Sequence, residues 1–373
     1  MIVGMERTTR GKTALLMLGA ALFCTGVWGG ESGSETLANR EANATCLDRF
    51  HDYFSTKLID WSDALDRSLS DALGHGDANG TASDAEDAAL REERSRSDRF
   101  FQTRKYLDET SQTYIRMRFA ASTSSLYDDR SHLYVRLHLP FFMVQKRLRF
   151  FVQDVNEENA KDLVRKTPRE NGSEPGARPE ESSPKFGLSY FAPGALGVET
   201  KYSVGLSGLH PYARARFHTV WNMSDWVFEP VETLQYSERS DFSEHTDLYF
   251  DTEPRPGRLF RIQLYRGTQA HRDGMYYGAA VSYEWIFSRH TGVRLVQSFA
   301  GDTAYTYTPR GSGESVRFRG VNRYTTALGY RRNLWRPWFF VEVIPSVGFS
   351  RADDYRPDYA LTFFVDAFFG NYR

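Results

Sequence analysis

The sequence contains little cysteine, and this scarcity excludes one class of exported protein. There are two cysteines among 373 residues, Cys24 and Cys46. Cys24 lies in an N-terminal segment that we expect to be removed, so Cys46 would remain alone and could not form an internal disulfide. A small scaffold stabilised by disulfides is therefore excluded, and the stability of the exported chain must come from another source. The sequence assigns no role to Cys46.

Long hydrophobic runs and an excess of charge are also missing. The formal net charge is −1, the hydrophobic content is 40% and the mean hydropathy is −0.54. Beyond the N-terminus, no run approaches the roughly 18 apolar residues that a membrane-spanning helix needs. These absences exclude a helical membrane protein, and we expect no nucleic-acid partner.

The first 30 residues have the pattern of a secretory signal peptide. Basic residues at positions 7, 10 and 12 precede an apolar run from Ala14 to Val27, and Gly29 and Gly30 follow it. The run is too short for a comfortable membrane helix, whereas a basic start and a short apolar stretch are typical of a cleaved leader. The pattern therefore predicts export, with residues 1–30 as the signal peptide.

Residues 31–110 predict a periplasmic helical segment. Apolar residues recur there at steps of three and four, with charged residues between them, which is the pattern of an amphipathic helix. The predicted apolar face comprises Leu47, Phe50, Phe54, Leu58, Trp61, Leu65 and Leu69. A polar, glycine-rich connector precedes a second helical stretch at about 84–109, so we expect a hairpin that packs on itself or on a barrel mouth. The apolar face could instead bind a periplasmic protein or a second copy of the chain.

From residue 111 onward, apolar and polar residues alternate with a period of two. In 131–140, Leu133, Val135 and Leu137 alternate with Tyr134 and Arg136. A soluble β-sandwich also alternates. However, the aromatic content is 15%, aromatic residues gather near the predicted strand ends, and the strand lengths approach the roughly 9–11 residues of a tilted spanning strand. The pattern predicts an all-β transmembrane protein, a single antiparallel up-and-down β-barrel of about 12–14 strands over residues 111–373.

The predicted connections support this topology. If the first strand runs outward, the long polar segments near 156–184 and 303–316 both fall outside, and short turns near 254–256 and 288–290 fall in the periplasm. Short periplasmic turns and long external loops are typical of outer-membrane barrels. The weakest predicted strands are 185–191, 197–205 and 226–237, and Pro230 interrupts the last of them. A barrel of 12 strands is therefore an alternative to one of 14.

The chain resembles a set of uncharacterised outer-membrane proteins of Gram-negative bacteria. The motifs that carry the resemblance are TYIRMRF at 113–119, LYVRLHLP at 133–140, RLRF at 147–150, the arginine-aromatic turn at 330–345 and FFG at 368–370. The resemblance covers most of the chain after Asp98. It implies a bacterial outer-membrane location, with lipid as a partner and a short helical segment before the barrel. It implies no catalytic residue and no cofactor.

Charged residues on the inward face of the predicted strands are the candidate site. The candidate lumen-lining residues are Arg116, Arg118, Arg136, His138, Arg147, Arg149, Arg214, Arg216, Asp247, Asp251, Arg261, Glu284, Arg323 and Asp366. Pairs of arginine and carboxylate could simply satisfy one another inside the barrel. Alternatively, an arginine-lined pore would favour anions.

The stretch DFSEHTD at 241–247 raises the question of an enzyme. Ser243, His245 and Asp247 share one face of a strand. Residues two apart on a strand lie about 6.6–6.8 Å apart along it, which is too far for a direct Ser–His hydrogen bond. The histidines are scattered and no metal site is predicted. We expect a passive or gated conduit for small solutes, with anions favoured. A non-conducting structural or docking barrel is the alternative, and a membrane-embedded acyl hydrolase is less expected.

Overall fold

The computed structural model of the chain describes residues 46–73, 96–103, 113–141, 148–154, 184–195, 197–238, 241–270, 273–307, 314 and 316–370. The predicted signal peptide and the predicted lumen residue Arg147 lie outside these described residues. Within them, the strands and the part of the first helix from His51 onward belong to one compact unit. No described helix is long and apolar enough to cross a membrane.

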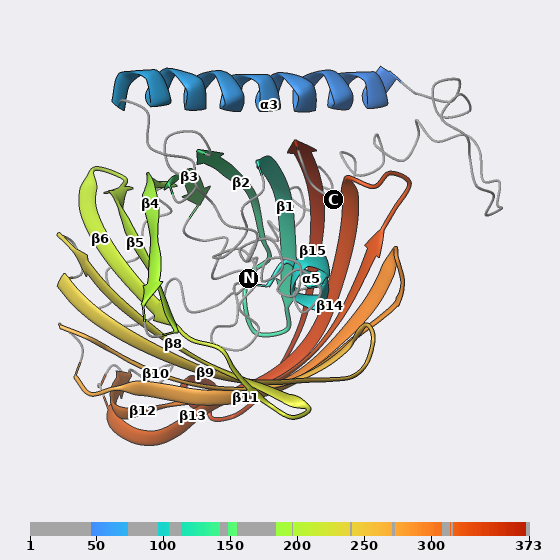
Figure 1. Cartoon of the computed structure of the whole chain (residues 1–373). Helices are drawn as coiled ribbons and strands as arrows, with labels where there is room; N and C mark the ends of the chain where they lie inside the picture. The colour runs from blue at the N-terminus through green and yellow to red at the C-terminus, as the bar shows by residue number, and fades with distance from the viewer. Residues whose placement is uncertain are drawn as a thin grey trace, which may run out of the picture. The chain divides into compact units, whose positions relative to one another are not determined.

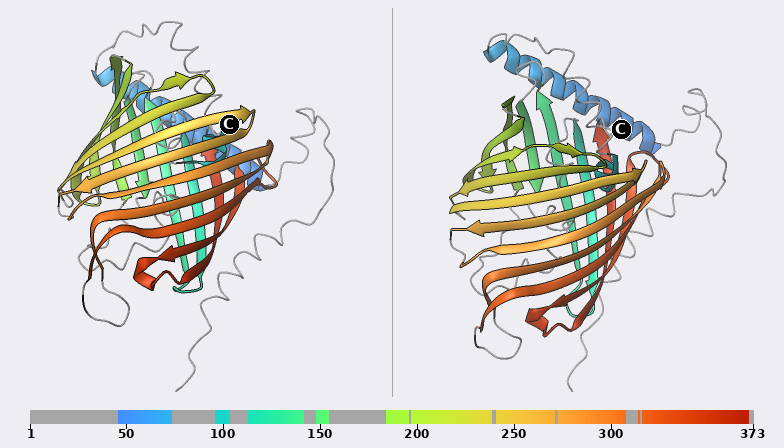
Figure 2. Two further views of the ribbon diagram at one scale, coloured as in Figure 1. Left: turned by 90° about the horizontal axis from the view of Figure 1, so that it is seen from below. Right: turned by 60° about the horizontal axis from the view of Figure 1, so that its bottom comes forward.

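Fourteen strands form a closed antiparallel ring (Figures 1 and 2). The strands of the ring are β1 (Tyr114–Ser124), β2 (Arg130–Phe141), β3 (Leu148–Asp154), β4 (Pro184–Ala195), β5 (Val198–Ser207), β6 (His210–His218), β8 (Trp226–Ser237), β9 (Asp241–Arg255), β10 (Arg258–Gln269), β11 (Tyr276–Ser288), β12 (Thr291–Tyr307), β13 (Val316–Asn333), β14 (Phe339–Ser350) and β15 (Pro357–Gly370). Each strand pairs with its neighbours in the sequence, and β1 pairs with β15. β7 (Trp221–Met223) pairs with the first residues of β8, while β6 pairs with the rest of β8 and so closes this part of the ring. The prediction of an up-and-down barrel is confirmed, and of the counts considered fourteen is correct.

The three weakest predicted strands are all present, as β4, β5 and β8. Proline lacks the backbone N–H that a central strand needs. Pro230 lies in β8 without breaking it because β6 ends at His218, which pairs with Val231. Beyond that pair, the Thr219 amide donates to the Pro230 carbonyl, and regular pairing resumes where Trp221 of β7 lies opposite Phe228. Pro230 therefore lies in the gap between the β6 and β7 pairings, where its missing N–H interrupts neither of them.

The two ends of the barrel differ in the length of their connections. We call the end at which β1 begins and β15 finishes the proximal end, and the other the distal end. At the proximal end, β9 and β10 are joined by residues 256–257, and β11 and β12 by residues 289–290. At the distal end, β3 and β4 are separated by residues 155–183. A barrel with tight turns on one side and long loops on the other has this asymmetry.

The alternation of the sequence sets the two faces of the wall. Leu133 and Val135 on β2 are 54% and 44% exposed, while Tyr134 and Arg136 between them are buried. The same exposure of apolar side chains recurs around the ring, at Leu188, Val204, Leu264, Val281, Trp285, Leu295, Phe299, Leu328 and Leu361. A water-soluble sheet would bury these residues, whereas a closed barrel in lipid presents them outward and satisfies its whole backbone internally.

Two described helices precede the strands of the ring in the sequence. α3 (Cys46–Leu73) confirms the predicted amphipathic helix, but the structure does not bury the predicted apolar face. Leu58 is buried and Leu65 half-buried, whereas Leu47, Phe50, Phe54 and Trp61 are exposed; the side chain of Leu69 lies outside the described residues. The face that α3 buries comprises His51, Ser55, Leu58, Ser62 and Asp66.

The second predicted helical stretch, at about 84–109, is described only in part. In the described part of residues 84–109, only α5 (Arg96–Phe101) is helical. Its partners are interior side chains of the barrel, so α5 is not the second arm of a hairpin outside it (Figure 1). A short 3-10 helix, η2 (Arg351–Asp353), completes the described elements and turns the chain between β14 and β15.

Candidate functional site

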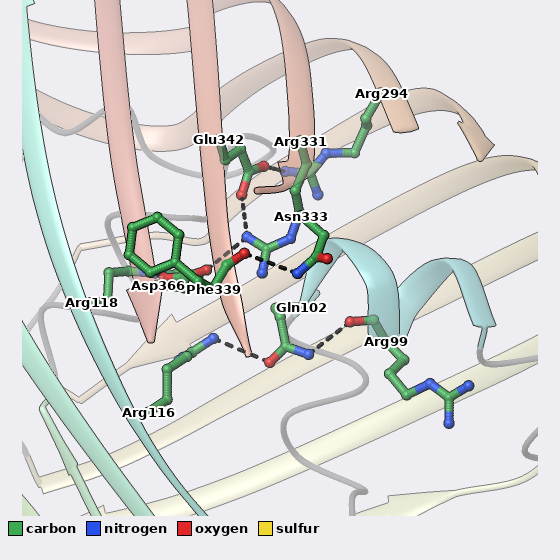
Figure 3. A network of polar contacts seen from close by, with 10 residues as sticks. All are labelled: Arg99, Gln102, Arg116, Arg118, Arg294, Arg331, Asn333, Phe339, Glu342 and Asp366. Atoms are coloured by element: carbon green, nitrogen blue, oxygen red, sulfur yellow. Dashed lines mark hydrogen bonds and ion pairs between the residues drawn. The ribbon is translucent and has the colours of Figure 1, made fainter. Parts of the chain in front are cut away.

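A network of arginines and carboxylates covers the inner wall at β1, β13, β14 and β15 (Figure 3). Arg118 lies opposite Asp366 in the β1–β15 register and donates to both of its carboxylate oxygens, with Nη2 2.7 Å from Oδ2. Arg331 Nη1 lies 2.7 Å from Asp366 Oδ2 and 3.0 Å from Glu342 Oε2. All four side chains are fully buried. Directly opposed inward positions on neighbouring strands allow such bidentate pairing, which strengthens charged hydrogen bonds.

α5 is anchored to the interior by an ion pair with a strand. Asp98 accepts hydrogen bonds from Arg261 of β10, at 2.7 Å from Nη1 and 2.9 Å from Nη2. The same guanidinium donates to Asp251 of β9 through Nε and Nη2, both at 2.7 Å. Asp98 and Arg261 are both buried. One arginine thus ties α5 to the wall while it remains tied to its neighbouring strand.

The other end of α5 is held by a different wall. Gln102 follows the helix, and its side-chain oxygen accepts from Arg116 Nη1 of β1 at 3.3 Å (Figure 3). The Arg294 guanidinium of β12 lies 5.4 Å from the centre of the Phe101 ring. Phe101 is fully buried, and these contacts all come from inward positions. The residues 96–103 therefore lie inside the barrel, near its proximal end.

The two anchors of α5 lie almost across the ring from each other. Going round the ring from β1 through β15, β14, β13, β12 and β11, β10 is the sixth strand, and the other way round it is the eighth. Arg261 on β10 and Arg116 on β1 therefore stand on nearly opposite walls. A segment bound to both therefore crosses the interior.

The interior is also divided by charge. Inward basic side chains gather on the wall from β1 to β6, at Arg116, Arg136, Arg149, Lys185, Lys201, Arg214 and Arg216. Inward carboxylates gather on the wall from β8 to β11, at Glu229, Asp247, Asp251 and Glu284. Among the described residues of β1 to β6, Glu199 at the beginning of β5 is the inward carboxylate, and it pairs with His218. An anion in the interior would therefore meet most of its attraction on one side.

His245 lies at the centre of a hydrogen-bond cluster on the acidic wall. Its Nδ1 lies 2.8 Å from the Tyr276 hydroxyl and its Nε2 lies 3.0 Å from Asp247 Oδ2. Gln263 donates to the other oxygen of Asp247 at 2.8 Å. Ser243 instead donates to the Gln235 carbonyl at 3.5 Å. The long His245 and Asp247 side chains span the two-residue step, but the serine does not join them, so no Ser–His–Asp triad forms.

The structure places the predicted lumen residues as follows. Strand registers put these residues on the inward face: Arg116, Arg118, Arg136, His138, Arg149, Arg214, Arg216, Asp247, Asp251, Arg261, Glu284, Arg323 and Asp366. They do not form one site. Arg118 and Asp366 belong to the network beside β1, Arg261 and Asp251 belong to the anchor of α5, and Arg214 donates to Gln235 at 3.0 Å.

Five interior residues of these networks are not among the lumen-lining residues predicted from the sequence: Asp98, Gln102, Arg294, Arg331 and Glu342. Arg294 sits between Val293 and Leu295, so the alternation alone would have placed it inward. Asp98 and Gln102 had no such signal, because their partners Arg261 and Arg116 lie far away in the sequence or on another element.

Comparison with known proteins finds similarity to solved structures alone. No family model and no curated protein matches the sequence. A loop L8 deletion mutant of OmpT, an outer membrane protein of Vibrio cholerae, has 9% identity and a TM-score of 0.41, over 70% of this chain and 99% of that chain. The anion-selective porin from Comamonas acidovorans has 10% identity and a TM-score of 0.40, over 70% and 100%. A KdgM porin in complex with disordered oligogalacturonate has 8% identity and a TM-score of 0.32, over 68% and 98%.

Proposed function

We propose that this chain is an outer-membrane conduit for small solutes, that it favours anions, and that α5 is its gate. The location follows from the architecture: a closed barrel with an apolar outer face is one of the two structures that can span a bilayer. Together with the export signal predicted for residues 1–30, this architecture supports a location in the outer membrane of a Gram-negative bacterium.

The observation that carries the gate is the pair of anchors on α5. The Asp98–Arg261 ion pair and the Gln102–Arg116 hydrogen bond hold one short segment to nearly opposite walls. A segment with a purely structural role could also connect the two walls, but it would not need buried charges to do so. Desolvated ion pairs are costly to form and costly to break, which suits a contact that must be either fully made or released.

The preference for anions rests on the basic wall. Rings or patches of arginine and lysine in a pore attract anions and disfavour cations. The basic side chains of β1 to β6 stand on one wall, while the carboxylates of β8 to β11 stand on the adjoining wall, where Asp251 pairs with Arg261 and Asp247 with His245. A small carboxylate- or phosphate-bearing solute would be drawn along β1 to β6.

The second candidate is a non-conducting structural barrel. The observation in its favour is the complete burial of Arg118, Arg331, Glu342 and Asp366, which fills part of the interior with side chains. Recording from the purified protein in planar bilayers, under a KCl gradient, separates the two. The conduit predicts openings whose reversal potential lies toward that of chloride. A silent barrel, both as wild type and as the Asp98→Asn variant, would favour the structural alternative.

A further inference from the structure

The face by which α3 contacts the barrel is mostly polar. His51 Nε2 donates to the Phe368 carbonyl at 2.8 Å, and its ring stacks on Trp338 at 4.5 Å with an angle of 9° between the planes. Ser55 Oγ accepts from the Gly370 amide at 3.1 Å. These contacts hold α3 to the proximal end, at the last residues of β15 and the turn before β14. They leave the aromatic side of the helix outward.

The exposed side of α3 is unusually apolar for a helix in water. Tyr53 is 65% exposed, Trp61 is 52% exposed and Phe54 is 38% exposed. Tyr53, Lys57 and Trp61 follow one another at steps of four, and Phe54 lies three residues before Lys57, so these residues form a single stripe along the helix. Exposed aromatic residues normally mark a surface that meets an apolar partner.

The stripe is continuous with the outward face of the barrel. The Phe54 ring meets the Phe369 ring edge-on at 5.2 Å. Phe369 ends the outward-facing row of β15 that begins with Leu361 and Phe363, and that row belongs to the exposed apolar surface of the barrel. Beside it, Trp335 and Phe339 form an aromatic cluster with centroids 6.5 Å apart. Aromatic residues at this level are typical of the boundary between lipid headgroups and acyl chains.

We propose that α3 is an interfacial helix that lies in the membrane surface at the proximal end, with its Tyr53–Phe54–Trp61 stripe among the lipids of that leaflet. The bilayer that covers Phe369 would also cover this stripe, because no polar surface separates the stripe from the outward face of β15. Lys57 fits this placement: its ammonium lies 6.0 Å from the centre of the Tyr53 ring, on the same side of the helix. A lysine in that position can extend its charge to an anionic phosphate while its stem stays in apolar surroundings.

The other exposed side of α3 is polar, which gives the helix the two faces that an interfacial helix needs. Asp52, Asp63 and Arg67 are all exposed and lie away from the stripe. Interfacial helices bury their apolar face to a depth of about 5–10 Å while the charged face stays in water. A partner protein or a second copy of the chain would have to displace lipid that is continuous with the barrel belt.

The test uses the full-length chain with Cys24 and Cys46 replaced by serine, reconstituted in vesicles of phosphatidylethanolamine and phosphatidylglycerol. Separate Tyr53→Cys and Asp63→Cys variants are labelled with an environment-sensitive fluorophore. We expect a blue-shifted emission at position 53 that is quenched by lipids carrying nitroxide on the upper acyl chain. The label at position 63 should stay in water and be quenched by a soluble quencher.

Two outcomes would overturn the proposal. One is a label at position 53 that stays water-exposed like that at position 63. The other is shielding of position 53 that requires a high protein-to-lipid ratio and produces energy transfer between labels on different chains, which would assign the stripe to a second copy. A Trp61→Cys variant repeats the measurement at the other end of the stripe, in case the first variant does not fold.

Discussion

Asp98 of α5 and Arg261 of β10 form a two-point ion pair inside the barrel, at 2.7 and 2.9 Å, although they are 163 residues apart in the sequence. Arg261 is bound on its other side by Asp251 of the adjacent strand. The wall therefore presents a prearranged guanidinium to a segment that precedes the first strand. This pair links the closed barrel to its proposed gate.

The contact of the barrel's outward face with lipid can be tested by introducing one charge. Leu133 faces outward from β2, and a Leu133→Arg substitution would place a guanidinium in lipid. Arginine on the lipid face near the middle of a membrane costs about 2–4 kcal/mol of folding free energy, and less near the interface. We expect a lower free energy of unfolding in lipid vesicles, measured by urea titration of tryptophan fluorescence. Leu209→Arg, at a 90% exposed position in the β5–β6 turn, is the matched control and should have little effect.

The buried network beside β1 should be essential for stability. Asp366→Asn keeps the shape of the side chain but removes the charge that faces Arg118 and Arg331. Removing one partner of a buried ion pair typically costs about 3–5 kcal/mol, because the other charge stays buried and uncompensated. The temperature at which the folded band is lost on unheated-versus-heated gel electrophoresis should fall clearly. Asp354→Asn makes the same chemical change at an exposed turn and should leave it unchanged.

The close approach of β4 and β5 depends on two facing glycines. A Cβ on Gly205 would lie 2.2 Å from the Phe186 carbonyl oxygen and 2.8 Å from the Gly187 Cα, both backbone atoms that cannot rotate away. Gly205→Ala should therefore reduce the yield of folded barrel, with an overpacking cost of at least about 1–3 kcal/mol. At Gly329, the nearest atoms to an added Cβ lie at 3.7 Å. Gly329→Ala should fold as wild type; equal loss in both variants would argue against this account of β4 and β5.

The strands and their faces could be predicted from the sequence, because a period of two is a local property of each segment. The outward position of Leu133 and the inward positions of Arg136 and Arg118 follow from it directly. The position of α5 could not be predicted, since RSDRFF makes the same short amphipathic turn whether it lies in water or in a lumen. The orientation of α3 also could not, because its apolar stripe marks an apolar neighbour without saying whether that neighbour is protein or lipid.

The basic wall should set the ion preference of the open conduit. Arg214→Glu reverses one charge on β6, where Arg214 Nε donates to Gln235 at 3.0 Å. We expect the reversal potential under a KCl gradient to move toward that of potassium. Arg289→Glu carries the same charge change in an exposed turn and should shift it less. Equal shifts in the two variants would mean that overall charge, rather than the wall of β1 to β6, sets the preference.

The most direct test of the gate is the conductance of Asp98→Asn compared with wild type in planar bilayers, with Asp63→Asn on the exposed side of α3 as the control. The substitution removes the charge that holds α5 to Arg261, so the account predicts a severalfold higher open probability or conductance in Asp98→Asn alone. Gel mobility of the unheated protein shows whether the variant barrel is folded. Folded Asp98→Asn protein with the conductance of wild type would contradict the account.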